Sequence, residues 1–509
     1  MVSPLKRCLC AITAIGFFSG LYANVTPNAL FCDHAVLQRD KSIPVWGEAA
    51  AGEKVKVSLG DSVAESTTAS TDGRWMVRLP AQKVGGPFKM VIEGENRIEL
   101  NDLWIGEVWV CSGQSNMERQ LGLRTGQQAL INWEAEVASA DFPQIRHFSV
   151  AKTPSSTPKT NVSGMWEVCS PQTVAQFSAV AYYFGRDLHR QLHVPIGLIH
   201  SSWGGTRVET WMSPELITTQ FPGVIKKQNA TLEKHKVEME KYKADEPALL
   251  KKWTEDCARA VSEGKKEPQK PTPPKALNIQ NQASQLYQGM IMPLQPYALR
   301  GVIWYQGESN NGNPGDYKTL FPAMIGDWRK NWNQGEFPFL FVQIAPHNNM
   351  SPEIRDAQLH SWRVTPNTAM AVLTDVGDAK DIHPTRKEPV GGRLALAARA
   401  LAYGEKIEYS GPLYKGFSVE GSKVILNFDH LGGGLEAQGG PLKGFAISSD
   451  GQAYHSAQAE IVGDTVVVSA EACEKPVAVR YGWENVPDVN LYNKAGLPAS
   501  PFKTELSAQ

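Results

Sequence analysis

Short apolar runs in the middle of the chain alternate with polar loops and helical patterns, and this alternation limits the fold more than any other feature. Of the helical patterns, Ser178–Leu192 lies between two such runs and Val390–Tyr403 follows the last one. Strands that alternate with helices form a parallel sheet covered by helices. We therefore predict an α/β domain whose ligands gather at the carboxyl ends of the strands. The apolar runs are Leu103–Cys111, Val194–His200, Leu299–Tyr305, Pro338–Ile344 and Ala369–Leu373.

Both flanks of this region show the two-residue alternation of half-buried strands. Turn residues separate the stretches before about residue 100, and similar stretches return after about Lys406. We expect β-sandwich or jelly-roll-like regions at 24–101 and 405–509, on either side of a catalytic-type α/β domain at 102–404. The second β region either forms its own sandwich or pairs with the first. The clearest stretches are Lys54–Leu59, Gly73–Leu79, Val424–Phe428 and Thr465–Ser469.

An insertion rich in Lys and Glu covers about residues 225–275. It has a helical pattern up to about Gly264 and then breaks in a Lys- and Pro-rich stretch. Mixed charge of this kind is typical of a solvated helix. A lid or a partner-binding segment is the alternative interpretation.

The first 23 residues have the pattern of a secretory signal peptide. Lys6 and Arg7 precede the apolar stretch Cys8–Leu21, and Ala23 offers a small-residue cleavage site. The apolar stretch is shorter than the roughly 20 residues that a membrane-spanning helix needs. We expect export to the periplasm or the medium and no stable membrane insertion after cleavage.

Charge and cysteine content exclude several classes of protein. The 51 Lys and Arg residues nearly balance the 52 Asp and Glu residues, which argues against a nucleic-acid binder. Five of the seven Cys residues lie beyond the predicted signal peptide. This odd, scattered set is not the pattern of a disulfide framework, although one or two disulfide bonds remain possible. A metal site would need more His, Asp or Cys residues at ligand spacing than the sequence shows. We expect neither a metal nor a cofactor.

Ser115 is a candidate nucleophile. It follows a predicted strand within Gly113-Gln-Ser-Asn-Met117, where the glycine permits a tight turn from strand to helix. Backbone N–H groups at a helix start can stabilise negative charge that develops beside the serine. The alternative interpretation is a serine that only caps the helix.

His383 is a candidate general base. It lies in a polar loop after a predicted strand, and Asp381 stands two residues before it. A carboxylate there can hold the imidazole in the tautomer that accepts a proton. A surface histidine beside a helix-capping aspartate, or a metal pair, is the alternative.

Four motifs in this order resemble the sialate O-acetylesterase family, within the SGNH-hydrolase superfamily of serine esterases. The resemblance extends over nearly the whole mature chain and implies an SGNH-hydrolase-like sheet with flanking helices. The motifs are Ser112-Gly-Gln-Ser-Asn-Met-Glu118, Trp203-Gly-Gly-Thr-Arg-Val-Glu-Thr-Trp211, Trp304-Tyr-Gln-Gly-Glu-Ser-Asn310 and Asp381-Ile-His-Pro384.

The resemblance implies that Ser115 is the nucleophile, that His383 is the base and that the oxyanion hole uses the Ser115 N–H. It adds a glycine N–H, for which we choose Gly205 over Gly204. Gln306 stands where the superfamily supplies an asparagine side chain to that hole.

The position of Asp381, the candidate acid of a Ser–His–Asp triad, departs from the superfamily pattern. The superfamily places its aspartate three residues before the histidine, where this chain has Lys380. Asp381 is one residue closer. A Ser–His dyad oriented by a backbone carbonyl or by Glu308 is therefore the alternative to a triad.

Arg207, Trp211, Tyr305 and Glu308 are the candidate substrate-binding residues. Arg207 can meet a carboxylate such as that of a sialic acid, or it can form an ion pair with Glu209 or Glu308. Aromatic rings in these motifs can stack on a sugar or pack in the core.

We expect an exported esterase that removes acetyl groups from O-acetylated sialic acids, free or glycan-linked. A deacetylase of xylan or another polysaccharide with the same chemistry is one alternative. A non-catalytic glycan-binding protein is the other.

Overall fold

The computed structural model describes residues 24–61 and 63–505, so the predicted signal peptide lies outside the described residues. The core is a sheet in the order β10-β9-β11-β8-β12-β13-β14. Its strands are β8 (Arg97–Gly113), β9 (Phe142–Ser149), β10 (Trp166–Cys169), β11 (Ile196–Ser202), β12 (Gly301–Tyr305), β13 (Phe339–Val342) and β14 (Thr368–Ala371).

Every neighbouring pair from β9 to β14 is parallel, and β10 is an antiparallel edge strand. The five predicted apolar runs form β8, β11, β12, β13 and β14. The prediction of an α/β fold with a parallel sheet is therefore confirmed.

Helices cover both faces of this sheet. Successive side chains of a strand point to opposite faces. Accordingly, Trp109 and Cys111 pack with α3 (Ala179–Leu192) and α8 (Glu388–Tyr403). Val108 and Val110 pack instead in the core that contains α6 (Pro314–Trp332) and α7 (Pro352–Val364). Burial on both faces explains why the strands are continuous apolar runs. The short helices α1 (Ser115–Glu118) and α2 (Trp133–Ser139) follow β8.

Strand β8 belongs to two parts of the molecule. Its first half pairs with the N-terminal strands β7 and β2, and its second half pairs with β11 and β12. The expected boundary between residues 101 and 102 falls inside this strand, where Asp102 adopts a φ of 56°. The other N-terminal strands are β1 (Thr26–Pro27), β2 (Val36–Gln38), β3 (Ile43–Glu48), β4 (Lys54–Leu59), β5 (Val63–Thr68), β6 (Arg74–Leu79) and β7 (Gly85–Glu93).

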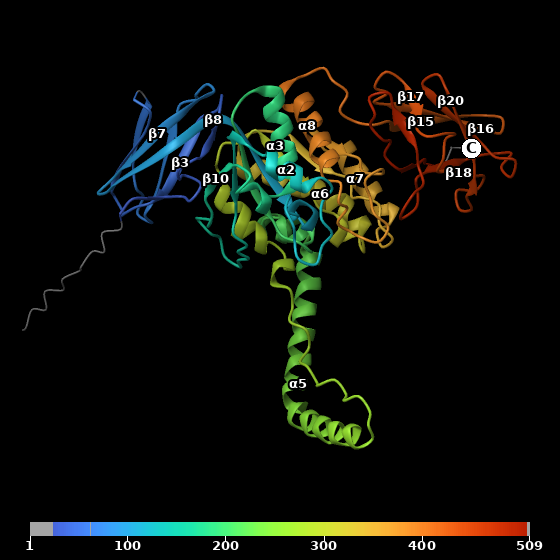
Figure 1. Ribbon diagram of the computed structural model, residues 1–509, viewed down its shortest axis with the longest axis horizontal. Coiled ribbons are helices and arrows are strands. Elements are labelled where there is room, and N and C mark those ends of the chain that lie inside the picture. Colours follow the sequence, from blue (N-terminus) through green and yellow to red (C-terminus); the bar gives the residue numbers. More distant parts are fainter. Residues whose placement is uncertain (1–23, 62, 506–509) are drawn as a thin grey trace, which may run out of the picture.

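The C-terminal strands form sheets of their own, at the end of the molecule opposite the N-terminal strands (Figure 1). In the described part of the chain, no sheet combines strands from both regions. The two β regions therefore do not pair. These strands are β15 (Leu413–Glu420), β16 (Lys423–Asp429), β17 (Leu435–Ala437), β18 (Phe445–Ser448), β19 (His455–Ser456), β20 (Gln458–Val462), β21 (Thr465–Ser469), β22 (Ala478–Tyr481), β23 (Leu491–Asn493) and β24 (Phe502–Lys503).

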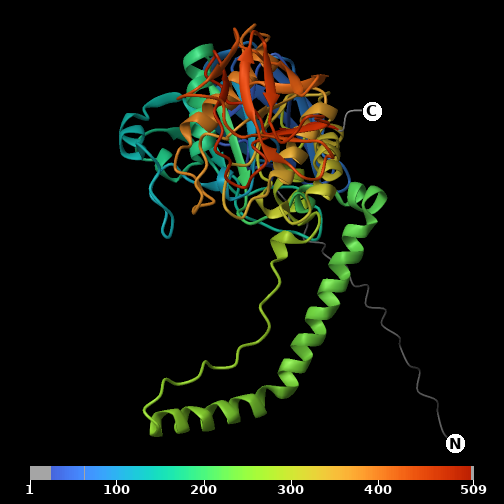
Figure 2. The same cartoon turned by 90° about the vertical axis from the view of Figure 1, so that its right-hand side faces the viewer.

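The charged insertion forms an arm, residues 222–278, that projects from the body (Figures 1 and 2). After α4 (Pro214–Gln220), the helix α5 (Pro222–Ser262) has no buried residue and contains Pro247, where a bend is expected. An extended segment returns along the helix, since Trp253 Nε1 donates to the Pro268 carbonyl at 3.0 Å. No helix among residues 24–61 and 63–505 is both long and apolar enough to cross a membrane. The five described cysteines are free.

The buried carboxylate of Glu107 connects neighbouring segments to β8 at the point where its two halves meet. Glu107 is fully buried and accepts from Arg39, from Arg300 Nε at 2.7 Å and from Gln38 Nε2 at 3.0 Å. Gln38 in turn accepts from the Val108 N–H at 2.8 Å. The Glu107 carboxylate of the central strand β8 thus binds side chains from the N-terminal strand β2, from the residue after it and from the segment before β12.

Glu107→Ala is expected to lower the free energy of unfolding by about 3 to 5 kcal/mol, because it leaves two arginines without their buried partner. Denaturant unfolding followed by tryptophan fluorescence measures this loss. Glu99→Ala is the matched control, since this residue is on the same strand but its ion pairs are exposed, and it should leave stability close to wild type. Equal effects of the two changes would contradict the role of Glu107.

Candidate active site

Ser115 lies in the first turn of α1, directly after the carboxyl end of β8. The turn requires glycine at position 113, whose φ is 137° and where a Cβ would lie 2.1 Å from the Tyr305 carbonyl oxygen. The Gln114 N–H donates to that same carbonyl at 2.9 Å. The end of β12 therefore holds the turn that presents Ser115. As in any helix, the first N–H groups of α1 have no partner within the helix.

The glycine pair of the second motif lies against Ser115. The Trp203 N–H donates to the Gly113 carbonyl at 3.1 Å, and a Cβ on Gly204 would lie 3.2 Å from the Ser115 Cβ. The Gly204 N–H is bound to the Glu118 carboxylate. The N–H of exposed Gly205, whose φ is 71°, has no acceptor among the described residues. Of the two glycines, Gly205 therefore has the N–H that a ligand can use.

Gln306 departs from our expectation. Its side chain is fully buried, and its amide donates to Asn310 Oδ1 at 2.7 Å and to the Thr206 carbonyl at 3.2 Å. Its oxygen accepts from the Tyr317 hydroxyl at 3.0 Å. Because both amide hydrogens are engaged, Gln306 does not donate into an oxyanion hole in this arrangement. It supports the loop that contains Gly205 instead.

His383 faces two polar side chains. Its Nδ1 lies 3.6 Å from Asp381 Oδ1 and 3.4 Å from Gln127 Nε2. The Asp381 oxygen also accepts from the His383 backbone N–H at 2.8 Å. Burial lowers the pKa of His383, and the charge of Lys387 lowers it further, while Asp381 opposes the shift. The imidazole is therefore neutral at neutral pH, as a general base must be.

Asn116 ties the Ser115 turn to the His383 loop. Its Nδ2 donates to the Ile382 carbonyl at 3.0 Å and to Glu308 Oε1 at 2.6 Å, and its Oδ1 accepts from Lys387. Its neighbour in sequence on one side is the candidate nucleophile, and its acceptor Ile382 precedes the candidate base. All polar atoms of the Asn116 amide are used in holding the two loops together.

Glu308 and Lys387 form the buried charged part of this network. Burial raises the pKa of Glu308, and burial lowers the pKa of Lys387 to about 7. The Glu308 carboxylate faces Asn116 and not the imidazole, so the alternative in which Glu308 orients His383 finds no support here. Glu308 is also buried, so, contrary to our expectation, it offers little surface to a substrate.

Trp211 and Tyr305 are also corrected by the structure. Both are fully buried, so neither ring face can stack on a sugar. Trp211 packs edge-on against Trp304 and donates to Thr206 Oγ1 at 3.1 Å. Tyr305 lies under Lys387, whose Nζ is 5.4 Å from the ring centre. Trp211 and Tyr305 therefore pack in the core beneath the loops of the site.

Arg207 remains exposed and forms no ion pair in the part of the chain that the structure describes. The two carboxylates that we considered as partners are bound elsewhere, Glu209 to Asn310 Nδ2 at 2.9 Å and Glu308 to Asn116. Its guanidinium is therefore available to an anionic ligand.

Three residues of this site were missed by sequence reasoning. Asn116 adjoins the serine in its motif, and that position was a usable signal. Gln127 and Lys387 have no local signal, because only the fold brings them to His383 and Asn116. In the described part of the chain, no group of three or more His, Cys, Asp or Glu residues could hold a metal ion.

Comparison with known proteins shows what this chain is similar to. A family model described as carbohydrate esterase, sialic acid-specific acetylesterase, matches residues 105–243 and 275–399. Sialate O-acetylesterase of Rattus norvegicus is 32% identical, with 93% of each chain covered. The human enzyme is 29% identical over 99% of this chain and 95% of its own. The crystal structure of a carbohydrate acetylesterase from Xanthomonas citri is 36% identical, with a TM-score of 0.78 over 94% of this chain and 99% of that one.

Lys387→Met is expected to move the acid limb of the kcat/KM profile to higher pH. The change removes a positive charge that lowers the pKa of His383, so the imidazole is protonated at higher pH and loses its function as a base there. Because the pKa of Lys387 is about 7, the residue carries its charge throughout the acid limb. Hydrolysis of 4-nitrophenyl acetate between pH 4 and 8 (roughly the range over which His titrates) measures the shift.

Lys380→Met is the control for this shift, because Lys380 is exposed in the same loop. The double change Lys387→Met with Glu308→Gln keeps the buried network uncharged and guards against misfolding. An acid limb that stays in place, or moves to lower pH, in both Lys387 variants would contradict the assignment.

Proposed function

The chain belongs to the sialic acid-specific acetylesterase family of carbohydrate esterases, and on this premise we propose that it is an exported serine esterase acting on O-acetylated sialic acids. Esterase activity on carbohydrate O-acetyl groups follows from the family. The serine mechanism, the sialic acid and export are the proposal.

The observation that carries the serine mechanism is the tie through Asn116. It joins the turn that presents Ser115 to the loop that contains His383. Ser115 Oγ attacks the acetyl carbon while His383 accepts the hydroxyl proton. The carbonyl oxygen becomes an oxyanion and accepts hydrogen bonds from the N–H groups of Ser115 and Gly205, at about 3 kcal/mol for each donor.

Collapse of this intermediate breaks the bond between the acetyl carbon and the sugar oxygen. His383 returns its proton to that oxygen, and the acetyl group stays on Ser115. Water, activated by His383, then attacks the acetyl-enzyme and releases acetate, which restores the serine. Asp381 stabilises the imidazolium at Nδ1, and Gln127 lies on the same side of the ring.

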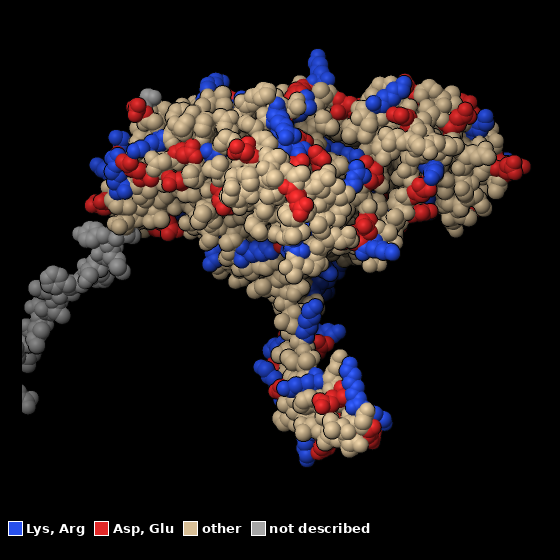
Figure 3. Space-filling model, viewed as in Figure 1, with Lys and Arg blue, Asp and Glu red and all other residues tan. Residues whose placement is uncertain are grey.

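Arg207 supports a sialic acid as substrate. An arginine without an ion pair beside the glycine loop matches the carboxylate that distinguishes sialic acids from neutral sugars. Figure 3 shows charges of both signs interspersed on one face of the protein. A single local cation would be enough to select the anion. Deacetylation of a neutral polysaccharide by the same chemistry is the outcome if Arg207 has no such effect.

Export rests on the N-terminal pattern alone. Lys6 and Arg7 precede an apolar stretch of signal-peptide length, followed by Ala23.

Ser115→Ala is expected to reduce acetate release from 9-O-acetyl-N-acetylneuraminic acid by about four orders of magnitude or more, since no other group replaces the nucleophile. An enzymatic acetate assay measures the loss. Ser112→Ala is the matched control, because Ser112 belongs to the same motif but is buried and donates to the Ser201 carbonyl. More than about 1% residual activity in Ser115→Ala would exclude this serine as the nucleophile.

Arg207→Ala is expected to lower kcat/KM on the O-acetylated sialic acid about 10- to 100-fold. This loss corresponds to the free energy of one hydrogen bond to a charged group. The loss on 4-nitrophenyl acetate, which has no carboxylate, should be far smaller. Lys226→Ala on α5 removes an exposed cation that does not line the pocket beside Arg207 and serves as control. Equal losses on both substrates would contradict a carboxylate site at Arg207 and favour a neutral substrate.

A further inference from the structure

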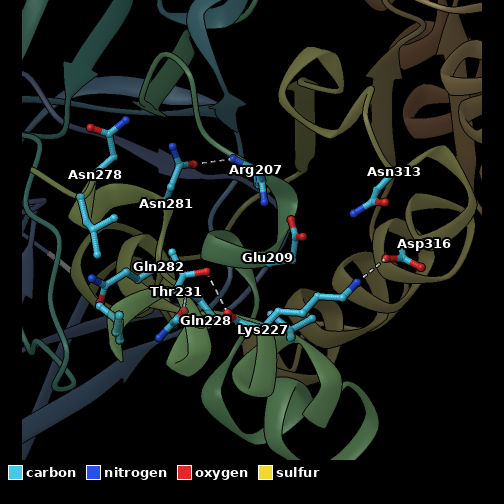
Figure 4. Close-up of a pocket in the computed structure, with 14 residues that line it drawn as sticks. Arg207, Glu209, Lys227, Gln228, Thr231, Asn278, Asn281, Gln282, Asn313 and Asp316 are labelled. Carbon is cyan, nitrogen blue, oxygen red and sulfur yellow. Dashed lines mark hydrogen bonds and ion pairs between the residues drawn. The ribbon is translucent and has the colours of Figure 1, made fainter. Parts of the chain in front are cut away.

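A cavity of about 310 Å³ lies between the glycine loop and the base of the arm (Figure 4). Its walls come from the loop after β11, from the first turns of α5, from the segment that returns from the arm and from the start of α6. Its volume is near the lower end of the range for small-molecule sites. The lining residues outside the arm are Arg207, Glu209, Asn281, Gln282, Ala283, Asn313 and Asp316.

The cavity is joined directly to the loop that lies against Ser115. Asn281 donates to the Gly205 carbonyl at 2.8 Å and accepts from the Arg207 N–H at 3.0 Å, so it holds the loop on both sides of Thr206. Arg207 is three residues beyond Gly204, which limits their Cα atoms to about 11 Å apart. A disaccharide whose acetyl ester is at Ser115 can reach the cavity.

The chemistry of the walls suits a hydroxyl-rich ligand. The amides of Gln228, Asn278 and Gln282 line it together with the Thr231 hydroxyl. Val224, Leu232 and Leu277 supply apolar surface for the C–H face of a sugar ring. Such a mixture of apolar surface and a few polar groups is typical of small-molecule sites.

Of the four charged residues that line the cavity, Lys227 and Asp316 form an ion pair, whereas Arg207 and Glu209 form none among the described residues. Lys227 Nζ lies 3.4 Å from Asp316 Oδ2, and Glu209 accepts from Asn310. The arm side of the cavity thus offers hydrogen bonds without a free charge, while Arg207 at its edge offers the cation. A neutral sugar attached to an anionic one fits this distribution.

The base of the arm is anchored only lightly to the body. Val224 and Ile225 are partly buried against the core, but no side chain of α5 is fully buried. The Ala283 N–H donates to Gln228 Oε1 at 2.7 Å and so fastens the returning segment to the helix. All cavity residues fall within the parts of the chain that match the family model, whereas residues 244–274 of the arm do not.

We infer that this cavity is a saccharide subsite, in which the base of the arm binds the neutral sugar that carries the acetylated sialic acid. The inference rests on the proposed function and extends it from the free sugar to the glycan. The arm then serves to favour glycan-linked sialic acid over the free monosaccharide.

The test is a calorimetric titration of Ser115→Ala with 3′-sialyllactose and with N-acetylneuraminic acid. Sialyllactose is expected to bind about tenfold more tightly, the contribution of one or two additional hydrogen bonds. Adding Thr231→Trp, which fills the cavity from α5, should remove this difference. Ala230→Trp is the matched control, because it places the same bulk at the next exposed position of the helix, outside the cavity, and should preserve the difference.

Two results would overturn the subsite. Sialyllactose could bind no more tightly than N-acetylneuraminic acid, or Thr231→Trp could leave its affinity equal to that of the Ala230→Trp control. In the active enzyme, Thr231→Trp should lower the ratio of kcat/KM for O-acetylated sialyllactose to that for the O-acetylated monosaccharide. Failure of the proposed function is seen separately, as absence of acetate release from both substrates by the wild-type enzyme.

Discussion

The strand β8 is the constraint on which the rest of the structure depends. It pairs with N-terminal strands along its first half and forms the middle of the parallel sheet along its second half. Glu107 fastens these halves through two arginines. Ser115 follows the carboxyl end of β8 by two residues, so its position is set by strands on both sides. A serine placed in this way needs no flexible loop to hold it.

Buried polar groups hold together the loops that contain Ser115 and His383, and their burial lowers the stability of the fold. Asn116 contacts Glu308, Ile382 and Lys387, which come from three different segments of the chain. Removing such charges from water is unfavourable, and the pKa shifts of Glu308 and Lys387 record that cost. A core of apolar side chains would be no less stable, but it would not set the direction of each loop by hydrogen bonds. The network also keeps a positive charge near His383, which favours the neutral imidazole.

The face above the site has the opposite character. Arg207 is exposed and forms no ion pair among the described residues, and the amides of the cavity that it lines come from the arm and from the segments beside it. Beneath the loops, Asn116, Glu308 and Lys387 bind one another, whereas the cavity beside Arg207 is open to a ligand. The same loop separates the two environments, because Gly204 and Gly205 allow it to pass close to Ser115 and to turn with a positive φ.

The sequence by itself determined the order of strands and helices and the positions of Ser115, His383 and Arg207, because periodicity and short motifs are local. The helix from Pro222 was predictable for the same reason, although its projection from the body was not. Only the tertiary structure decided which way side chains point. Gln306, Trp211 and Tyr305 are in motifs that adjoin the site, yet they turn inward. Residues from elsewhere in the chain hold them there, since Thr206 accepts from the Gln306 amide, Trp304 packs on Trp211 and Lys387 lies over the Tyr305 ring. Whether a residue next to a strand end faces substrate or core depends on the neighbours that the sheet brings to it, and no local pattern contains that information.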